Sequence, residues 1–289
     1  MLGRFFLVRP KAFLVSFTIA TSMWVGTGFA QDISQDISEA IEPDEFTMEK
    51  KFDFLAGSIG DSITVAMDAR LPFANRGLNW STGTRSAIMV NSHALRLRAM
   101  MPDKSVGTKN LAISGSKAPD VVEQAKKMAE LRPDYVTVLI GANDVCSWNE
   151  NHQAQLLSYE SNMRTIIKTL IANNDEIKIL VSAIPNMPLL RDIGAANGCQ
   201  SRWSLLNICP ALLGADRTDA DRAGFADRWE DANEILARVS ADFPRHVRFA
   251  ASISEPIFNF GHLSSLDCFH PNVSGQDFLS EMTWKDGWY

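Results

Sequence analysis

Apolar residues along this chain form two kinds of segment that alternate with each other. Four short runs are almost continuous in apolar residues and are bounded by glycine, proline or polar positions, which is typical of buried strands. These runs are residues 52–56, 135–140, 177–184 and 247–251. Four longer segments have the character of helices, one of them opened by a proline. They are residues 84–99, 119–131, 153–171 and 219–240.

The alternation of strands and helices predicts an α/β protein, with a parallel sheet covered by helices on both faces. Residues 185–217 fit neither pattern and are predicted to be irregular. In open parallel sheets, ligands bind beyond the carboxyl ends of the strands. We therefore expect the residues with a chemical role in the loops that follow the strands.

The first thirty residues predict a secretory signal peptide. Three basic residues precede a mostly apolar run at residues 12–24, and small residues at positions 28 and 30 form a cleavage site. A membrane anchor is the alternative, but the run is shorter than the ~20 apolar residues that a spanning helix needs. We expect cleavage after Ala30, a secreted or periplasmic protein, and no stable membrane span in the mature chain.

The mature chain is expected to consist of a polar, acidic leader at residues 31–50 and a single domain at residues 51–289. Loss of the signal peptide moves the formal charge from −6 to −9, because it removes basic residues alone. An acidic chain is a poor partner for nucleic acid, which binds basic patches. We therefore expect no nucleic-acid partner, and the oligomeric state stays open.

Four cysteines, at positions 146, 199, 209 and 268, permit three disulfide pairings. Export favours disulfides and argues against a reduced catalytic thiol. We expect a Cys199–Cys209 bond, because both residues lie in the segment predicted to be irregular, where a short closed loop would replace missing secondary structure. Cys146 and Cys268 would then pair with each other.

The first candidate catalytic segment is Gly60-Asp61-Ser62, directly after the first predicted strand. A serine hydroxyl is a weak nucleophile that needs a neighbouring base and a sharp turn, which glycine permits. Capping a helix is the more ordinary role of such residues. The common esterase motif Gly-x-Ser-x-Gly is absent from the sequence, so a serine hydrolase here would be of another kind.

Two further loops offer hydrogen-bond donors. Gly115 follows a brief apolar segment at residues 110–113 and can bring its backbone N–H close to a substrate oxygen. Asn143 follows the strand at residues 135–140 and can present its side-chain N–H to a developing oxyanion. An ordinary loop glycine and an Asx turn are the alternatives.

The fourth candidate segment is Asp267-Cys268-Phe269-His270, near the carboxyl end of the sequence. An aspartate three residues before a histidine can hold one ring nitrogen and leave the other free as a base. His262, Asp267 and His270 can also be considered as metal ligands, but we expect neither a metal nor a cofactor.

Together, Ser62, Gly115, Asn143 and the Asp267/His270 pair stand in the order and contexts of the SGNH, or GDSL, hydrolases. The chain resembles this family over residues 52–280, and phospholipase B-like members most of all. The segments that carry the closer resemblance are residues 76–81, 110–112, 143–146 and 267–270. The second half of the chain also resembles acyloxyacyl hydrolases.

This resemblance implies a fold and a set of roles. The fold is a flavodoxin-like, three-layer α/β/α sandwich with a central parallel sheet. Ser62 is the implied nucleophile, His270 the general base and acid, and Asp267 the residue that orients His270. The implied oxyanion hole combines the backbone N–H groups of Ser62 and Gly115 with the side-chain amide of Asn143. The family needs no metal.

The implied function is hydrolysis of carboxylic acyl esters through an acyl-enzyme, with lipids or (lyso)phospholipids as the expected substrates. A carbohydrate O-deacetylase or a thioesterase is the alternative enzyme on the same fold. A non-catalytic binding protein is a third reading, which the presence of Ser62, Asn143, Asp267 and His270 together disfavours.

Overall fold

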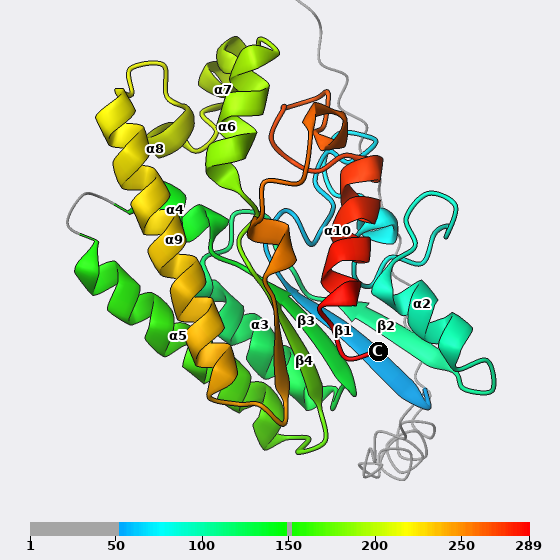
Figure 1. Ribbon diagram of the computed structural model, residues 1–289. Coiled ribbons are helices and arrows are strands. Elements are labelled where there is room, and N and C mark those ends of the chain that lie inside the picture. Colours follow the sequence, from blue (N-terminus) through cyan, green and yellow to red (C-terminus); the bar gives the residue numbers. More distant parts are fainter. Residues whose placement is uncertain (1–51, 149–151) are drawn as a thin grey trace, which may run out of the picture. The chain divides into compact units, whose positions relative to one another are not determined.

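The computed structural model describes residues 52–148 and 152–289, which build a five-stranded sheet with helices around it (Figure 1). The strands are β1 (Phe54–Gly60), β2 (Val106–Asn110), β3 (Tyr135–Leu139), β4 (Lys178–Ser182) and β5 (Val247–Ala250). Their order is β2-β1-β3-β4-β5, and every neighbouring pair is parallel. The predicted parallel α/β architecture is confirmed, and this order is the flavodoxin-like one.

Both faces of the sheet are buried, because successive side chains of a strand point to opposite faces. Val136 and Val138 of β3 and Val181 of β4 pack into the large core on one face. Tyr135 and Leu180, which alternate with them, pack into a second core on the other face. This two-sided burial explains why the strands are almost continuous in apolar residues.

Helices cover both faces and complete the three layers. The first helical layer consists of α3 (Ala118–Glu130), α5 (Gln153–Ala172) and α9 (Asp219–Ala241), and the second of α2 (His93–Met100) and α10 (Val273–Lys285) (Figure 1). Residues at the amino ends of several of these helices explain where they begin. Pro119 lies in the first turn of α3, and Thr218 caps α9 in a reciprocal capping box with Asp221.

Some element boundaries differ from those expected. The first strand extends to Gly60, and the second strand lies immediately before the apolar residues 110–113. The helix expected at residues 84–99 begins only at His93, because the Ser92 hydroxyl caps it by accepting the N–H of Leu95 at 3.2 Å. The helix α10 was not anticipated.

The prediction that residues 185–217 are irregular is wrong. They contain α6 (Met187–Ala196), α7 (Gln200–Leu206) and α8 (Pro210–Leu213), together called the α6–α8 segment below. These helices are too short to show a clear period in the sequence. Trp203 of α7 is buried over Gly194 of α6, where a Cβ atom would lie 2.3 Å from the indole.

Residues 1–50, which include the predicted signal peptide and acidic leader, lie outside the described residues. Within the part of the chain that the structure describes, no helix has the length and apolar character needed to cross a membrane.

Candidate active site

Ser62 lies just beyond the carboxyl end of β1, in a turn that requires glycine. Gly60 has a φ of +147°, and a Cβ atom there would lie 2.2 Å from the carbonyl oxygen of Leu139 on β3. Gly60 therefore allows the ends of the two strands to approach each other. The turn is closed where the N–H of Met67 donates to the carbonyl oxygen of Ser62 at 3.0 Å. Residues 61–75 are called the serine loop below.

Gly115 and Asn143 come from the loops after β2 and β3, and a hydrogen bond joins these loops. Nδ2 of Asn143, in α4 (Ala142–Ser147), donates to the carbonyl oxygen of Ser116 at 3.0 Å. Gly115 is exposed, has a φ of +81°, and no atom of the described residues lies within 4 Å of the position of a Cβ. The space on the side where a side chain would lie is therefore open.

Gln124 of α3 ties these loops to the serine loop. Its side-chain oxygen accepts the N–H of Gly60 at 2.8 Å, and its Nε2 donates to the Gly60 carbonyl and to the Ser116 hydroxyl, both at 3.0 Å. Gln124 is not among the residues predicted from the sequence. A glutamine within the apolar face of a predicted helix is the signal that identifies such a residue.

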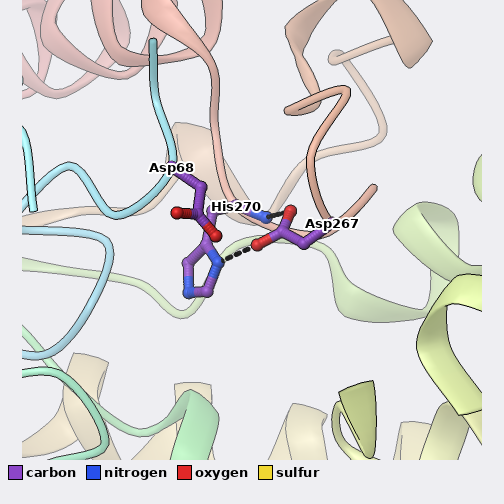
Figure 2. A group of neighbouring side chains, drawn as sticks. All are labelled: Asp68, Asp267 and His270. Atoms are coloured by element: carbon purple, nitrogen blue, oxygen red, sulfur yellow. Dashed lines mark hydrogen bonds and ion pairs between the residues drawn. The ribbon is translucent and has the colours of Figure 1, made fainter. Parts of the chain in front are cut away.

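Asp267 and His270 form a hydrogen-bonded pair in residues 263–272, the histidine loop (Figure 2). Oδ2 of Asp267 binds Nδ1 of His270, while Oδ1 accepts the backbone N–H of Phe269 at 2.8 Å and of His270 at 3.0 Å. Burial alone would raise the pKa of Asp267, but the bond from the His270 ring and these backbone donors hold that pKa below its usual value. With Nδ1 held by a carboxylate, Nε2 is left to act as a base.

Long-range hydrogen bonds fasten the histidine loop and α10 to the serine loop. The hydroxyl of Ser264 donates to the carbonyl oxygen of Asp68 at 2.7 Å. Nε2 of Gln276, in α10, donates to the carbonyl oxygen of Ile63 at 3.0 Å. Through these bonds the fold brings together two loops that lie some two hundred residues apart in the sequence.

The structure corrects the predicted disulfide pairing. Cys146 is bonded to Cys209, and Cys199 is bonded to Cys268, so neither expected bond is present. The expected Cys199–Cys209 bond is absent because residues 185–217 are helical and need no short closed loop in place of secondary structure. The two disulfides instead join the α6–α8 segment to α4 and to the histidine loop. Cys199 precedes α7, and the indole N–H of Trp203 donates to the carbonyl oxygen of Cys268 at 3.2 Å.

Asp68 of the serine loop is a neighbour of the histidine loop that sequence reasoning missed. An oxygen of Asp68, an oxygen of Asp267 and a ring nitrogen of His270 all lie within 4.8 Å of one another (Figure 2). His262, which was considered with these two residues as a metal ligand, stacks on the ring of Phe278 instead. Asp68 could not be found from sequence spacing, because it is about two hundred residues from Asp267.

Two buried carboxyl groups lie directly beside the candidate residues. Burial raises the pKa of Asp61 to about 7 and that of Asp144 to about 6. Oδ1 of Asp61 accepts the N–H of Ile63 at 3.0 Å, whereas its Oδ2 has no hydrogen-bond partner among the described residues. Asp144 accepts the N–H of Ala118 at the start of α3. Asp61 is therefore mainly protonated below about pH 7 and Asp144 below about pH 6.

Residues 76–81, part of the closer resemblance noted above, form a buried network. The N–H of Trp80 donates to the side-chain oxygen of Gln276 at 2.9 Å, and the hydroxyl of Ser81 bonds that of Thr137 on β3 at 2.7 Å. Residues 79–81 have the Asn-x-Ser pattern of a glycosylation site, but Asn79 is fully buried and inaccessible in the folded chain. These residues position the elements of the site.

An apolar pocket is lined by sequence neighbours of the candidate residues, although Ser62, Asn143 and His270 are not among its lining residues. Four of its lining residues are immediate sequence neighbours of Ser62, Asn143 or His270: Ile63, Ala142, Phe269 and Pro271. Met187 and Leu190 of α6 line it as well. The α6–α8 segment therefore contributes to a pocket that would accept an apolar group.

Comparison with known proteins agrees with this fold. The model of the GDSL-like lipase/acylhydrolase family matches residues 58–278. The chain is 26% identical over 278 residues to the membrane-associated phospholipase B1 of Rattus norvegicus, covering 80% of this chain and 19% of that protein. It is 31% identical over 130 residues to the phospholipase B1 of Homo sapiens, covering 35% of this chain and 9% of that protein. The chain thus spans about a fifth of the rat relative.

A crystal structure of a GDSL-like lipase from Parabacteroides merdae has the same fold, with a TM-score of 0.52 and 19% identity over 81% of this chain and 95% of that chain. Since the family match covers most of the sequence, the chain belongs to the GDSL-like lipase/acylhydrolase family. The resemblance to this family that the sequence predicted is confirmed.

Proposed function

We propose that this chain hydrolyses carboxylic acyl esters with Ser62 as nucleophile, His270 as general base and acid, and Asp267 as the residue that orients His270. The observation that carries the proposal is the hydrogen-bonded Asp267–His270 pair on a loop fastened to the serine loop. A base oriented by a carboxylate is the arrangement that activates a serine hydroxyl.

In the proposed acylation step, Nε2 of His270 takes the proton of the Ser62 hydroxyl while Oγ attacks the ester carbonyl carbon. The negative charge that develops on the carbonyl oxygen is stabilised by the backbone N–H groups of Ser62 and Gly115 and by the Asn143 amide. His270 then returns the proton to the leaving alcohol, and the acyl group stays on Ser62. Water, activated by the same imidazole, releases the acid and restores Ser62.

The apolar pocket supports an acyl group of a lipid as the substrate. Ile63, Ala142 and Phe269 line the pocket and are next in the sequence to Ser62, Asn143 and His270, so we propose that the acyl chain occupies this pocket while its carbonyl carbon is at Ser62. The two phospholipase B1 relatives are consistent with a phospholipid or lysophospholipid ester.

Exposed apolar side chains on the loops of the site support the same substrate class. They are Leu71 and Phe73 in the serine loop, Ile113 just before Gly115, and Leu266 just before Asp267. Apolar side chains exposed together around a site favour contact with apolar ligands or lipid aggregates.

The first test is covalent labelling. A fluorophosphonate probe should label the wild-type protein on Ser62 and should fail to label Ser62→Ala, which should also lose all ester hydrolysis because no nucleophile remains. Ser58→Ala, which removes a serine hydroxyl from the neighbouring strand β1, is the control for expression and folding. Labelling or turnover that persists in Ser62→Ala would exclude Ser62 as nucleophile.

A panel of acetyl, short-chain and long-chain esters, with a matched thioester, separates the substrate classes. The lipid proposal expects kcat/KM to rise from acetyl to longer acyl esters. A preference for acetylated sugars or for the thioester would identify the O-deacetylase or the thioesterase instead.

We also infer that the chain is exported. All four cysteines are paired in the two disulfides, which fits an oxidising, extracellular environment. The expected signal peptide at residues 1–30 would provide the route. Amino-terminal sequencing of the protein from the medium or periplasm should begin at Gln31, and accumulation of the uncut chain in the cytosol would contradict this.

A further inference from the structure

Asp68 is a carboxyl group that the proposed mechanism does not use, although it lies against two residues that the mechanism does use. Its carboxyl oxygen is within 4.8 Å of both an Asp267 oxygen and a His270 ring nitrogen. Figure 2 shows Asp68 reaching the imidazole from a different segment of the chain than Asp267. Three ionisable groups therefore meet at one place, where the proposed triad requires two.

The backbone of Asp68 is fixed from both sides. Its N–H donates to the carbonyl oxygen of Phe73 at 2.9 Å, and its carboxylate Oδ1 accepts the N–H of Phe73 at 2.7 Å. Its own carbonyl oxygen accepts the Ser264 hydroxyl of the histidine loop at 2.7 Å. Asp68 also has a φ of +53°, which is uncommon for a residue other than glycine. The side chain is thus held beside the histidine loop.

Two carboxyl groups this close cannot both ionise without repulsion. Burial and the nearby charge of Asp267 raise the pKa of Asp68, whereas the pKa of Asp267 lies below its usual value. Of the two carboxyl groups, Asp68 is therefore the one that binds a proton first as the pH falls. At higher pH, an ionised Asp68 adds a second negative charge beside the imidazole.

We propose that Asp68 is a positioning residue of the hydrolytic site, which holds Asp267 against His270 and supports the positive charge that His270 acquires. This inference rests on the proposed function, because it assigns Asp68 a role through His270. It explains why the serine loop closes with a hydrogen-bonded turn between Asp68 and Phe73 beside the histidine loop.

Other titratable or charged groups also face Asp68, Asp267 and His270 and contribute to the electrostatic field there. Asp61, under Ser62, interacts with the charge of His270. Arg202 of α7 donates to the carbonyl oxygen of Ser265 at 2.8 Å. His262 precedes the histidine loop, and burial lowers its pKa. All three remain in place when Asp68 is changed, so a variant at position 68 isolates its own contribution.

The test compares Asp68→Asn with Asp68→Ala in the full-length protein, using the pH dependence of kcat/KM for a soluble short-chain ester. Asparagine keeps an acceptor for the Phe73 N–H and a donor for Asp267 but cannot ionise. Asn75→Ala is the matched control, because Nδ2 of Asn75 closes the same serine loop by donating to the carbonyl oxygens of Leu71 and Phe73, both at 2.8 Å.

We expect Asp68→Asn to shift the midpoint of the rise in kcat/KM to lower pH by about 0.5–1 unit, because the imidazolium loses a neighbouring negative charge. Its kcat should fall by about 3-fold. Asp68→Ala should show the same shift and a fall in kcat of about 10-fold or more with KM little changed, since it also removes the polar side chain that lies beside Asp267. Asn75→Ala should leave the midpoint unchanged.

An unshifted midpoint in Asp68→Asn, or an equal shift in Asn75→Ala, would overturn the role of Asp68. Ser62→Ala is assayed alongside. Its full activity would refute the proposed function itself, whereas an inactive Ser62→Ala with an unshifted Asp68→Asn refutes this inference alone.

Discussion

At the scale of single residues, the site is built from donors whose own partners fix their direction. Asn143 shows this most clearly, since one N–H of its amide donates to the Ser116 carbonyl at 3.0 Å and leaves the other for a ligand. At the neighbouring Gly115, the space on the side where a side chain would lie is open among the described residues. A donor that is already aimed needs no reorganisation when charge develops on a substrate oxygen.

We expect Asn143→Ala to lower kcat by on the order of 10²–10³ with KM little changed, because a lost oxyanion donor matters most in the transition state. Steady-state kinetics on one soluble ester measures both parameters. Ser147→Ala, an exposed position on the same helix α4, is the control and should behave as wild type. A raised KM as the sole defect would instead assign Asn143 to substrate binding.

At the scale of elements, the two disulfides fasten the α6–α8 segment at different places. Cys146–Cys209 joins α4, which carries Asn143, to the start of α8. Cys199–Cys268 joins the start of α7 to the histidine loop, between Asp267 and His270. The second bond therefore holds the loop that carries the proposed base, and the first holds the segment that lines the apolar pocket.

The two disulfides should contribute equally to stability and unequally to activity. They span 63 and 69 residues, so the chain-entropy model assigns each about 4 kcal/mol. We expect Cys199→Ser/Cys268→Ser to lower kcat about 10-fold or more, whereas Cys146→Ser/Cys209→Ser keeps kcat within about 3-fold at a temperature where both are folded. Urea unfolding and kinetics of the two double variants provide the comparison, and equal losses of kcat would contradict it.

At the scale of the whole molecule, covering the sheet on both faces buries ionisable groups whose protonation is linked to folding. His93 lies in the core, where Nδ1 bonds the Tyr135 hydroxyl at 2.7 Å and Nε2 bonds the Thr283 hydroxyl at 2.9 Å. Burial lowers the pKa of His93 to about 3 and raises that of Asp61 to about 7. The two groups act on stability in opposite directions.

The direction in which each group changes the stability with pH follows from the protons that it binds in the folded and unfolded states. Between about pH 4 and 7, the folded chain keeps the Asp61 proton that the unfolded chain has lost, so this group makes stability fall as pH rises. Between pH 6.5 and about 3, the unfolded chain protonates His93 and the folded chain does not, so this group makes stability fall as pH falls. Each contributes up to about 1.4 kcal/mol per pH unit in its window.

We expect Asp61→Asn to gain stability relative to wild type as pH rises from 4 to 7 and to keep a constant advantage above pH 7, since the variant never places a charge in this buried position. His93→Gln should show the opposite trend, with its deficit shrinking below pH 6.5. Urea unfolding of both variants from pH 4 to 8 measures this. A difference between Asp61→Asn and wild type that does not change with pH would show that Asp61 ionises normally.

The sequence by itself determined the features that depend on neighbouring residues. Apolar runs set the strands, Pro119 and Thr218 mark helix starts, and Gly60 marks the turn before Ser62, because propensity and backbone freedom act over a few positions. The Asp267–His270 bond could also be predicted, since its partners are three positions apart in one loop. The parallel sheet followed from the alternation of elements.

Only the tertiary structure decided which distant segments meet. The disulfide partners, the Gln276–Ile63 bond, the approach of Asp68 to Asp267 and the apolar pocket join residues from about sixty to more than two hundred positions apart. The sequence holds no local signal for such contacts, because they form only when the helices pack and the strands take their order in the sheet. The α6–α8 segment shows the same limit: its short helices are stabilised by tertiary packing, which sequence periodicity does not report.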